Sequence, residues 1–169
     1  AAVHMRKAGY DAVILEGKAA KPVILYIKDT LVGFLDAQAF WGLSSFEAEE
    51  RLRKIYGRDA GIISIGQGGE HLVKFACVVS QEGRAGGRPG MGAVMGSKNL
   101  KAVVIEGSGN IQASHTNELK EQGLAGFKDI LAKPNYAFWK RRGTLSTVEW
   151  GNENSVLPSF NYREGVFGA

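Results

Sequence analysis

Cysteine is almost absent from this sequence, because Cys77 is the only one among 169 residues. A single thiol cannot close an internal disulfide, so we predict a protein of a reducing compartment, the cytoplasm. One thiol also cannot hold an iron–sulfur cluster, which normally needs about four cysteine thiolates. Long apolar runs are missing too, and no stretch is long enough to cross a bilayer, so we expect no membrane association.

The composition is otherwise that of an ordinary globular protein. Hydrophobic residues make up 44% and charged residues 22%, which is enough for a domain with its own core. The net charge of +4 permits binding of phosphate or nucleic acid but does not require it.

Short apolar runs bounded by turn residues predict a β-rich first part. A helix should begin after Ser44, because Ser44 and Glu47 have the spacing of a capping box, and it should end at Gly57. The runs predicted as strands are 11–16, 23–27, 31–35, 61–65, 72–79 and 100–106.

From Thr116 onward the apolar residues follow a helical period, which predicts a second, helical part. The sequence Gly-Ser-Gly-Asn at 107–110 favours a domain boundary, so we expect one domain at 1–110 and the start of another at 111–169. The basic opening and the uncapped end at 165–169 suggest a segment of a longer polypeptide.

The most informative stretch is the glycine-rich segment 83–101. Its glycines allow close approach of the backbone to a ligand, and Arg84 and Arg88 suit a phosphate or a planar heterocycle. A short helix beginning near Gly92 would aim free N–H groups at the same anion. These features predict a site for a phosphorylated, planar ligand; Glu70, just after a strand, is a weaker candidate for it.

Other interpretations of this segment stay open. It lacks the glycine–lysine spacing of a phosphate-binding P-loop, and a flexible loop with solvated arginines would have a similar composition. A binding module for phosphorylated ligands or nucleic acid is a further possibility, although no aromatic residue lies between Gly83 and Lys101 to stack on bases.

The run Gly-Arg-Ala-Gly-Gly-Arg at 83–88, followed by 92–105, resembles the signature of the tungsten-containing aldehyde:ferredoxin oxidoreductase family. Segments 8–19, 35–43 and 65–70 resemble earlier parts of that family, with Gln67 in place of a common proline. Pro89 likewise replaces a common glycine. Residues 143–144, 154, 157–161 and 165–167 resemble the entry to the family's second domain.

The resemblance implies an α+β fold: a two-sheet, β-rich pterin-binding platform with a helix, followed by the start of an all-α domain. It also implies a tungsten-bis(molybdopterin) cofactor, with a magnesium ion between the pterin phosphates and a [4Fe–4S] cluster bound by parts of the parent protein outside this chain. The residues that match the family's pterin contacts are Arg84, Ala85, Gly87 and Arg88, and the backbone carbonyl of Ala85 would also bind the magnesium ion.

The implied activity is oxidation of aldehydes to carboxylic acids, with ferredoxin as the electron acceptor. No catalytic residue is expected within this segment, which would be inactive alone. The implied partners are ferredoxin and the aldehyde substrate, with a homodimer as a further expectation and no nucleic acid. The alternatives are a related tungsten subunit that reduces an aromatic acyl thioester, and the non-catalytic phosphate- or nucleotide-binding module.

Overall fold

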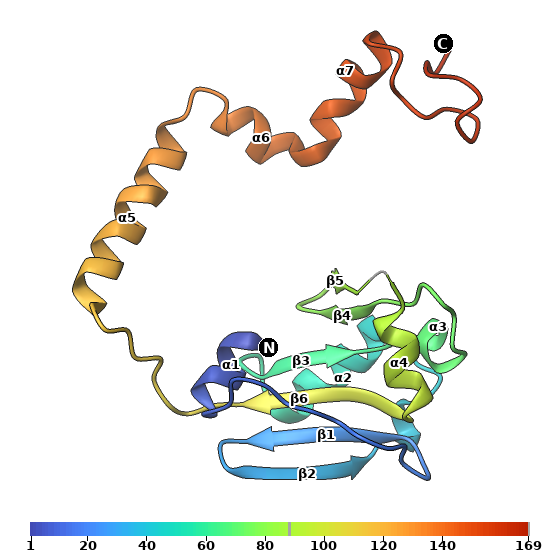
Figure 1. Cartoon of the computed structure of the whole chain (residues 1–169), viewed down its shortest axis with the longest axis vertical. Helices are drawn as coiled ribbons and strands as arrows, with labels where there is room; N and C mark the ends of the chain where they lie inside the picture. Colours follow the sequence, from blue (N-terminus) through green and yellow to red (C-terminus); the bar gives the residue numbers. More distant parts are fainter. Residues whose placement is uncertain (88, 169) are drawn as a thin grey trace. The chain divides into compact units, whose positions relative to one another are not determined.

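The computed structural model describes residues 1–87 and 89–168, which divide into two units, Ala1–Ile111 and Gln112–Ala169. The first unit contains a six-stranded mixed sheet with the strand order β2-β1-β6-β3-β4-β5 (Figure 1). The α+β class is therefore confirmed. The expectation of two sheets in this part was wrong, because all six strands among the described residues lie in one sheet.

The strands of this sheet are β1 (Val23–Lys28), β2 (Leu31–Asp36), β3 (Gly61–Ser64), β4 (Val78–Ser80), β5 (Arg84–Gly86) and β6 (Leu100–Glu106). The predicted hairpin is present as the antiparallel pair β1 and β2. Strand β6 pairs parallel with β1 and antiparallel with β3. It is the most buried strand of the sheet and carries the long apolar run that such a central position requires.

Each face of the sheet supports its own apolar cluster. On one face, helix α2 (Ser45–Tyr56) packs Leu52 against Ile24 and Val104. On the other face, helix α1 (Ala2–Lys7) and the segment that follows it lie over Leu25 and Ile27 (Figure 1). The alternation of Ile24, Leu25 and Ile27 along β1 matches these two faces, because neighbouring strand residues point in opposite directions.

The capping box predicted for α2 is present. The Glu47 N–H donates to the Ser44 hydroxyl at 3.2 Å, and the Ser44 N–H donates to the Glu47 carboxylate at 3.0 Å. The Ser44 hydroxyl also donates to the Glu47 carboxylate, and this bond, together with that of the Ser44 N–H, lowers the pKa of the exposed Glu47 carboxyl. Gly57, with a φ of 87°, ends the helix as expected.

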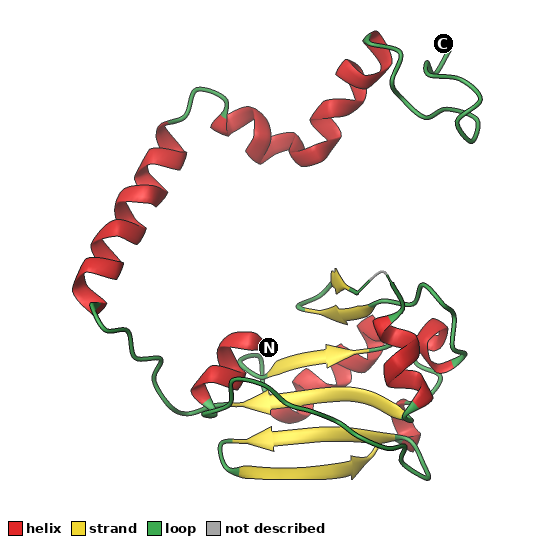
Figure 2. Cartoon of the chain, viewed as in Figure 1, coloured by secondary structure: helices red, strands yellow, loops and turns green. Residues whose placement is uncertain are grey.

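Two predicted strands are wrong. Segment 11–16 is a loop that crosses the face of the sheet (Figure 2), where Leu15 packs on the core and Ile14 is 85% exposed. The residues that flank it bond to other parts of the chain: the Tyr10 N–H donates to the Met5 carbonyl, and the Ala19 N–H donates to the Lys98 carbonyl. Apolar alternation alone therefore did not distinguish a loop lying on the sheet from a strand within it.

The second wrong strand is 72–79, of which only β4 from Val78 onward is extended. Leu72 has a φ of 59°, and the N–H groups of Leu72 and Val73 turn back to the carbonyls of Gly69 and Gly68. These bonds continue the short helix α3 (Gln67–Glu70) as a series of turns. The N–H groups of Leu72 and Val73 are therefore not available to a neighbouring strand.

The unit Gln112–Ala169 consists of helices α5 (Thr116–Ala132), α6 (Tyr136–Arg142) and α7 (Thr147–Glu153), with a 3₁₀ turn, η2 (Gly143–Ser146), before α7. Figure 2 shows loop after α7. The apolar residues of the predicted α5 stripe are exposed: Leu119, Leu124, Phe127, Ile130 and Leu131. The start of an all-α domain at 111–169 stays a prediction. Among the described helices, none is long and apolar enough to cross a membrane.

We expect Ser44→Ala to lower the free energy of unfolding by about 1 kcal/mol, because α2 loses the hydroxyl that satisfies the Glu47 N–H. The matched control is Ser45→Ala, since the Ser45 hydroxyl makes no hydrogen bond among the described residues. Urea unfolding followed by circular dichroism compares the two variants. Equal stability of Ser44→Ala and the control would contradict the capping role.

Candidate functional site

The glycine-rich segment forms the edge of the sheet and the helix that follows it. Strand β5 pairs with β4, with Ala85 opposite Val79, and it is the last strand of the sheet. Along its outer edge, β5 therefore has no neighbouring strand within the described part of the chain. Arg84 and Ala85 are exposed there, and Arg84 makes no ion pair among the described residues.

Three of the four predicted site residues, which are close neighbours in the sequence, lie in or directly after β5. Arg84 and Ala85 lie in β5, and Gly87 follows it directly. Arg88 lies outside the described residues. Gly87 has a φ of 75°, and a Cβ there would meet the Met91 side chain at 2.3 Å. Position 87 therefore requires glycine for two reasons: its backbone is left-handed, and there is no space for a side chain.

Helix α4 (Met91–Ser97) follows the segment and begins at Gly90, whose φ is 107°. A short helix near Gly92 was predicted, but its first N–H groups are not free for a ligand. The Met91 N–H donates to the Gly87 carbonyl at 3.1 Å, and the Gly92 N–H donates to the Ala76 carbonyl at 2.8 Å. The expected anion site at this helix terminus is therefore corrected: both N–H groups hold the loop together instead.

Glycines also determine how α4 packs against α3. A Cβ on Gly96 would lie 1.9 Å from the Gly69 carbonyl oxygen, and a Cβ on Gly69 would lie 2.8 Å from the Gly92 carbonyl oxygen. The two helix backbones are in direct contact at these positions. The glycines of this region therefore provide packing within the protein as well as the backbone freedom predicted from the sequence.

A buried ion pair lies beneath the two helices, and sequence analysis missed it. The Lys101 ammonium in β6 binds the Glu70 carboxylate at the end of α3, and both side chains are almost completely inaccessible to solvent. Lys101 also donates to the Leu43 carbonyl at 2.8 Å, while Glu70 accepts from the Gly42 N–H at 2.9 Å. Burial lowers the pKa of Lys101 below its ordinary value, although the bond to Glu70 opposes that shift.

Glu70 is thus a structural partner of Lys101 and is not exposed to a ligand. Gln67, which replaces the common proline, adds a bond of 2.6 Å from its amide to the Gly42 carbonyl. The only signal in the sequence was a lysine inside the apolar run of β6. A strand buried on both faces cannot carry a charge without a partner.

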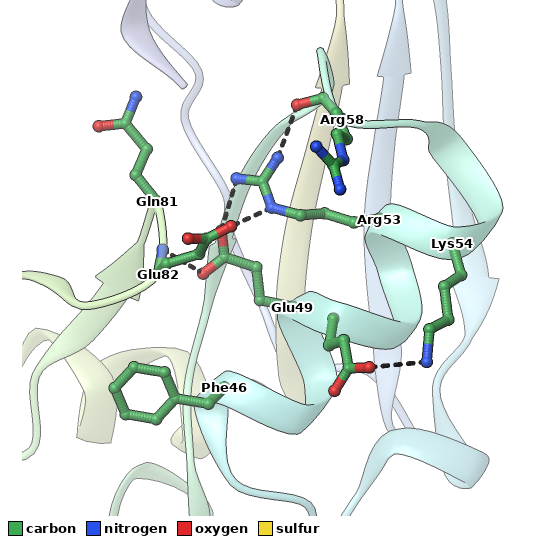
Figure 3. Close-up of a pocket in the computed structure, with 8 residues that line it drawn as sticks. Phe46, Glu49, Arg53, Lys54, Arg58, Gln81 and Glu82 are labelled. Carbon is green, nitrogen blue, oxygen red and sulfur yellow. Dashed lines mark hydrogen bonds and ion pairs between the residues drawn. The ribbon is translucent and has the colours of Figure 1, made fainter.

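The turn between β4 and β5 rests on helix α2. The Glu82 N–H donates to the Glu49 carboxylate at 3.1 Å, and Figure 3 shows this bond beside the contacts between Arg53 and Glu49. An open groove runs along this side of α2, lined by Phe46, Glu49, Glu50, Arg53, Lys54, Arg58, Gln81 and Glu82. The described residues include no cluster of three or more His, Cys, Asp or Glu side chains that could hold a metal.

These features define an α+β domain whose edge strand carries the exposed side chain of Arg84 beside a turn packed through glycines. Residues 1–107 match the family described as "Aldehyde ferredoxin oxidoreductase, N-terminal domain", and the chain belongs to this family. The resemblance noted from the segment at 83–105 is confirmed.

Two curated relatives come from Pyrococcus furiosus. Its tungsten-containing aldehyde ferredoxin oxidoreductase is 41% identical, over 96% of this chain and 27% of its own length. Its aliphatic sulfonate oxidoreductase, WOR-like subunit, is 36% identical, over 96% of this chain and 28% of its own length. The chain therefore spans about a quarter of the length of these relatives.

A solved structure gives a similar result. The active site complex BamBC of benzoyl coenzyme A reductase, in complex with 1,5-dienoyl-CoA, matches with a TM-score of 0.61 and 36% identity. The match covers 64% of this chain and 16% of that chain. About two thirds of this chain therefore share their fold with part of a chain of that complex.

We expect Gly96→Ala to destabilise the protein by about 1–3 kcal/mol, because the new Cβ collides with the Gly69 backbone. Gly68→Ala is the matched control, since a Cβ on this helical glycine has its nearest neighbour at an ordinary 3.9 Å. Thermal unfolding measures both variants. A Gly96→Ala variant as stable as Gly68→Ala would contradict the close contact of α3 and α4.

We expect Lys101→Met to cost roughly 3–5 kcal/mol, because it leaves the Glu70 carboxylate buried without a counter-charge. The double variant Lys101→Met/Glu70→Gln removes that charge while an amide oxygen still accepts from Gly42, so it should recover part of the loss. Chemical unfolding of the single and double variants tests this. A double variant less stable than Lys101→Met would show that the unpaired charge is not the cause.

Proposed function

We propose that this chain is the pterin-binding segment of a longer tungsten oxidoreductase that oxidises aldehydes to carboxylic acids and passes the electrons to ferredoxin. Membership of the aldehyde ferredoxin oxidoreductase family carries this proposal. The relative in Pyrococcus furiosus that is 41% identical is named as a tungsten-containing enzyme of this activity. Its much greater length leaves room for the parts of the site that this chain lacks.

The exposed edge of β5 fits the phosphate end of a pterin cofactor. Arg84 offers a guanidinium, which binds phosphate oxygens through two parallel N–H groups. Gly87 permits a close approach of the backbone because it carries no side chain. In this proposal the pterin and its phosphate are contacted by Arg84, Ala85, Gly87 and Arg88, of which Arg88 lies outside the described residues.

Ala85 is proposed to hold a magnesium ion through its backbone carbonyl. Magnesium prefers oxygen ligands and is commonly shared between protein groups and phosphates. Ala85 lies on the edge strand, beside Arg84, and its side chain is too small to block an approaching ion. The pterin phosphates would supply further oxygen ligands to the ion.

The chain's own contribution is binding and orientation. The tungsten centre, when bound, supplies the two-electron redox chemistry. Arg84 would neutralise phosphate charge through its guanidinium. The proposed [4Fe–4S] cluster needs cysteines from elsewhere in the polypeptide, because Cys77 is the only one here. Ferredoxin, the aldehyde and a homodimeric assembly are the proposed partners.

A second candidate is a tungsten subunit that reduces an aromatic acyl thioester. The match to the BamBC complex of benzoyl coenzyme A reductase favours it. The two candidates share the cofactor-binding role proposed for 83–88. They differ in the substrate and in whether that substrate is oxidised or reduced. Assays of the full-length protein with aliphatic aldehydes and with an aromatic acyl-CoA thioester would separate them.

We expect Arg84→Ala to lower the tungsten content of the purified full-length protein by about tenfold, since one charge-assisted contact to phosphate is worth roughly 1.5–3 kcal/mol. Arg51→Ala, an exposed arginine on α2, is the control and should retain normal tungsten. Elemental analysis by mass spectrometry measures both. Normal tungsten in Arg84→Ala would overturn the assignment of this residue to the cofactor site.

A further inference from the structure

A buried carboxylate on α2 holds the turn that leads into Arg84. Glu49 is 1% exposed, and one of its oxygens accepts the Glu82 N–H at 3.1 Å. Glu82 precedes Arg84 by only two residues. The bond therefore connects the core-facing side of α2 directly to the segment proposed to bind the cofactor.

The other oxygen of Glu49 is held by Arg53, one helical turn away. The Arg53 guanidinium donates to it through Nε at 3.1 Å and through Nη2 at 2.6 Å, and its third nitrogen donates to the Arg58 carbonyl at 2.6 Å (Figure 3). The two bonds to one oxygen hold that oxygen toward Arg53 and leave the other oxygen for the Glu82 N–H. Arg53 also provides the counter-charge that a buried carboxylate requires.

The turn itself is poorly stabilised by its own backbone. Gln81, Glu82 and Gly83 all have positive φ, at 50°, 58° and 125°. The left-handed conformation is unfavourable for a residue with a side chain. Strands β4 and β5 have only three residues each, and a hairpin so short is marginal alone. An external bond to the turn therefore has a large influence on where β5 lies.

We propose that Glu49, oriented by Arg53, is a positioning residue for cofactor binding. Its charged oxygen holds the Glu82 N–H, and this keeps the β4–β5 turn against α2 and directs Arg84 to the phosphate. The inference rests on the proposed function of Arg84. Glu49 itself touches no cofactor in this scheme and acts only through the turn.

The test is Glu49→Gln in the full-length holoenzyme, with Glu50→Gln as the matched control. The glutamine keeps the size of Glu49 but has only one acceptor oxygen, so it cannot serve both Arg53 and Glu82. Glu50 is the next residue of the same helix, but its carboxylate is exposed and pairs with Lys54 at 2.7 Å. The readout is the rate at which tungsten leaves the protein during dialysis against a chelator.

We expect Glu49→Gln to lose tungsten about tenfold faster than the unchanged protein, and Glu50→Gln to lose it at the normal rate. The effect of Glu49→Gln should disappear in an Arg84→Lys background, which retains a cation but lacks the fork, because Glu49 acts through Arg84. Arg53→Lys should increase the rate of tungsten loss by a smaller factor, with Lys54→Arg as its control. If Glu49→Gln does not fold, Arg53→Lys takes its place as the test.

The outcomes separate the two proposals. If Arg84→Ala lowers the tungsten content but Glu49→Gln loses the metal at the normal rate, the positioning role is overturned and the cofactor assignment stands. If Arg84→Ala has no effect, the cofactor assignment falls and the positioning role falls with it. Equal effects of Glu49→Gln in the unchanged protein and in the Arg84→Lys background would indicate general destabilisation and would also overturn the inference.

Discussion

The buried pair of Lys101 and Glu70 connects the parts on which the candidate site depends. Lys101 belongs to the central strand β6, and Glu70 ends α3, which packs against α4 after the glycine-rich turn. The same two side chains bind the Gly42–Leu43 backbone that leads into α2. Because neither charge is stable in the interior alone, the strand, the helix and the loop are held in one arrangement.

Close backbone contact is the second constraint on this region. Helices α3 and α4 are both short, and helices of this length are marginal without tertiary packing. Gly69, Gly92 and Gly96 let their backbones touch, which brings the start of α4 under Ala76 and Cys77. The turn containing Gly87 is therefore held by the first residues of α4, through the bond from the Met91 N–H to the Gly87 carbonyl.

A second ion pair joins the buried Glu49 to the half-buried Arg53 and supports the turn between β4 and β5. The two pairs differ in what they bind: Lys101 and Glu70 connect secondary structure elements, whereas Glu49 receives an N–H from the turn that precedes Arg84. Exposed ion pairs such as Lys54 with Glu50 contribute little by comparison, because water competes for both partners. The charges that matter for the geometry of the site are therefore the buried ones.

The sequence alone determined the hairpin at β1 and β2, the capped helix α2, the central strand β6 and the family, since each depends on a local pattern of residues. Ser44 with Glu47 and the Arg84–Arg88 segment are examples in which neighbouring residues carry the signal. Only the tertiary structure decided that 11–16 is a loop and that β4 and β5 belong to the same sheet as the other strands. It also decided that the N–H groups of Met91 and Gly92 bond to backbone carbonyls. Likewise, only the fold joined Lys101 to Glu70 and Glu49 to Glu82, because the residues of each pair are 31 and 33 positions apart. Contacts over such distances depend on how the whole chain packs, and no local pattern encodes them.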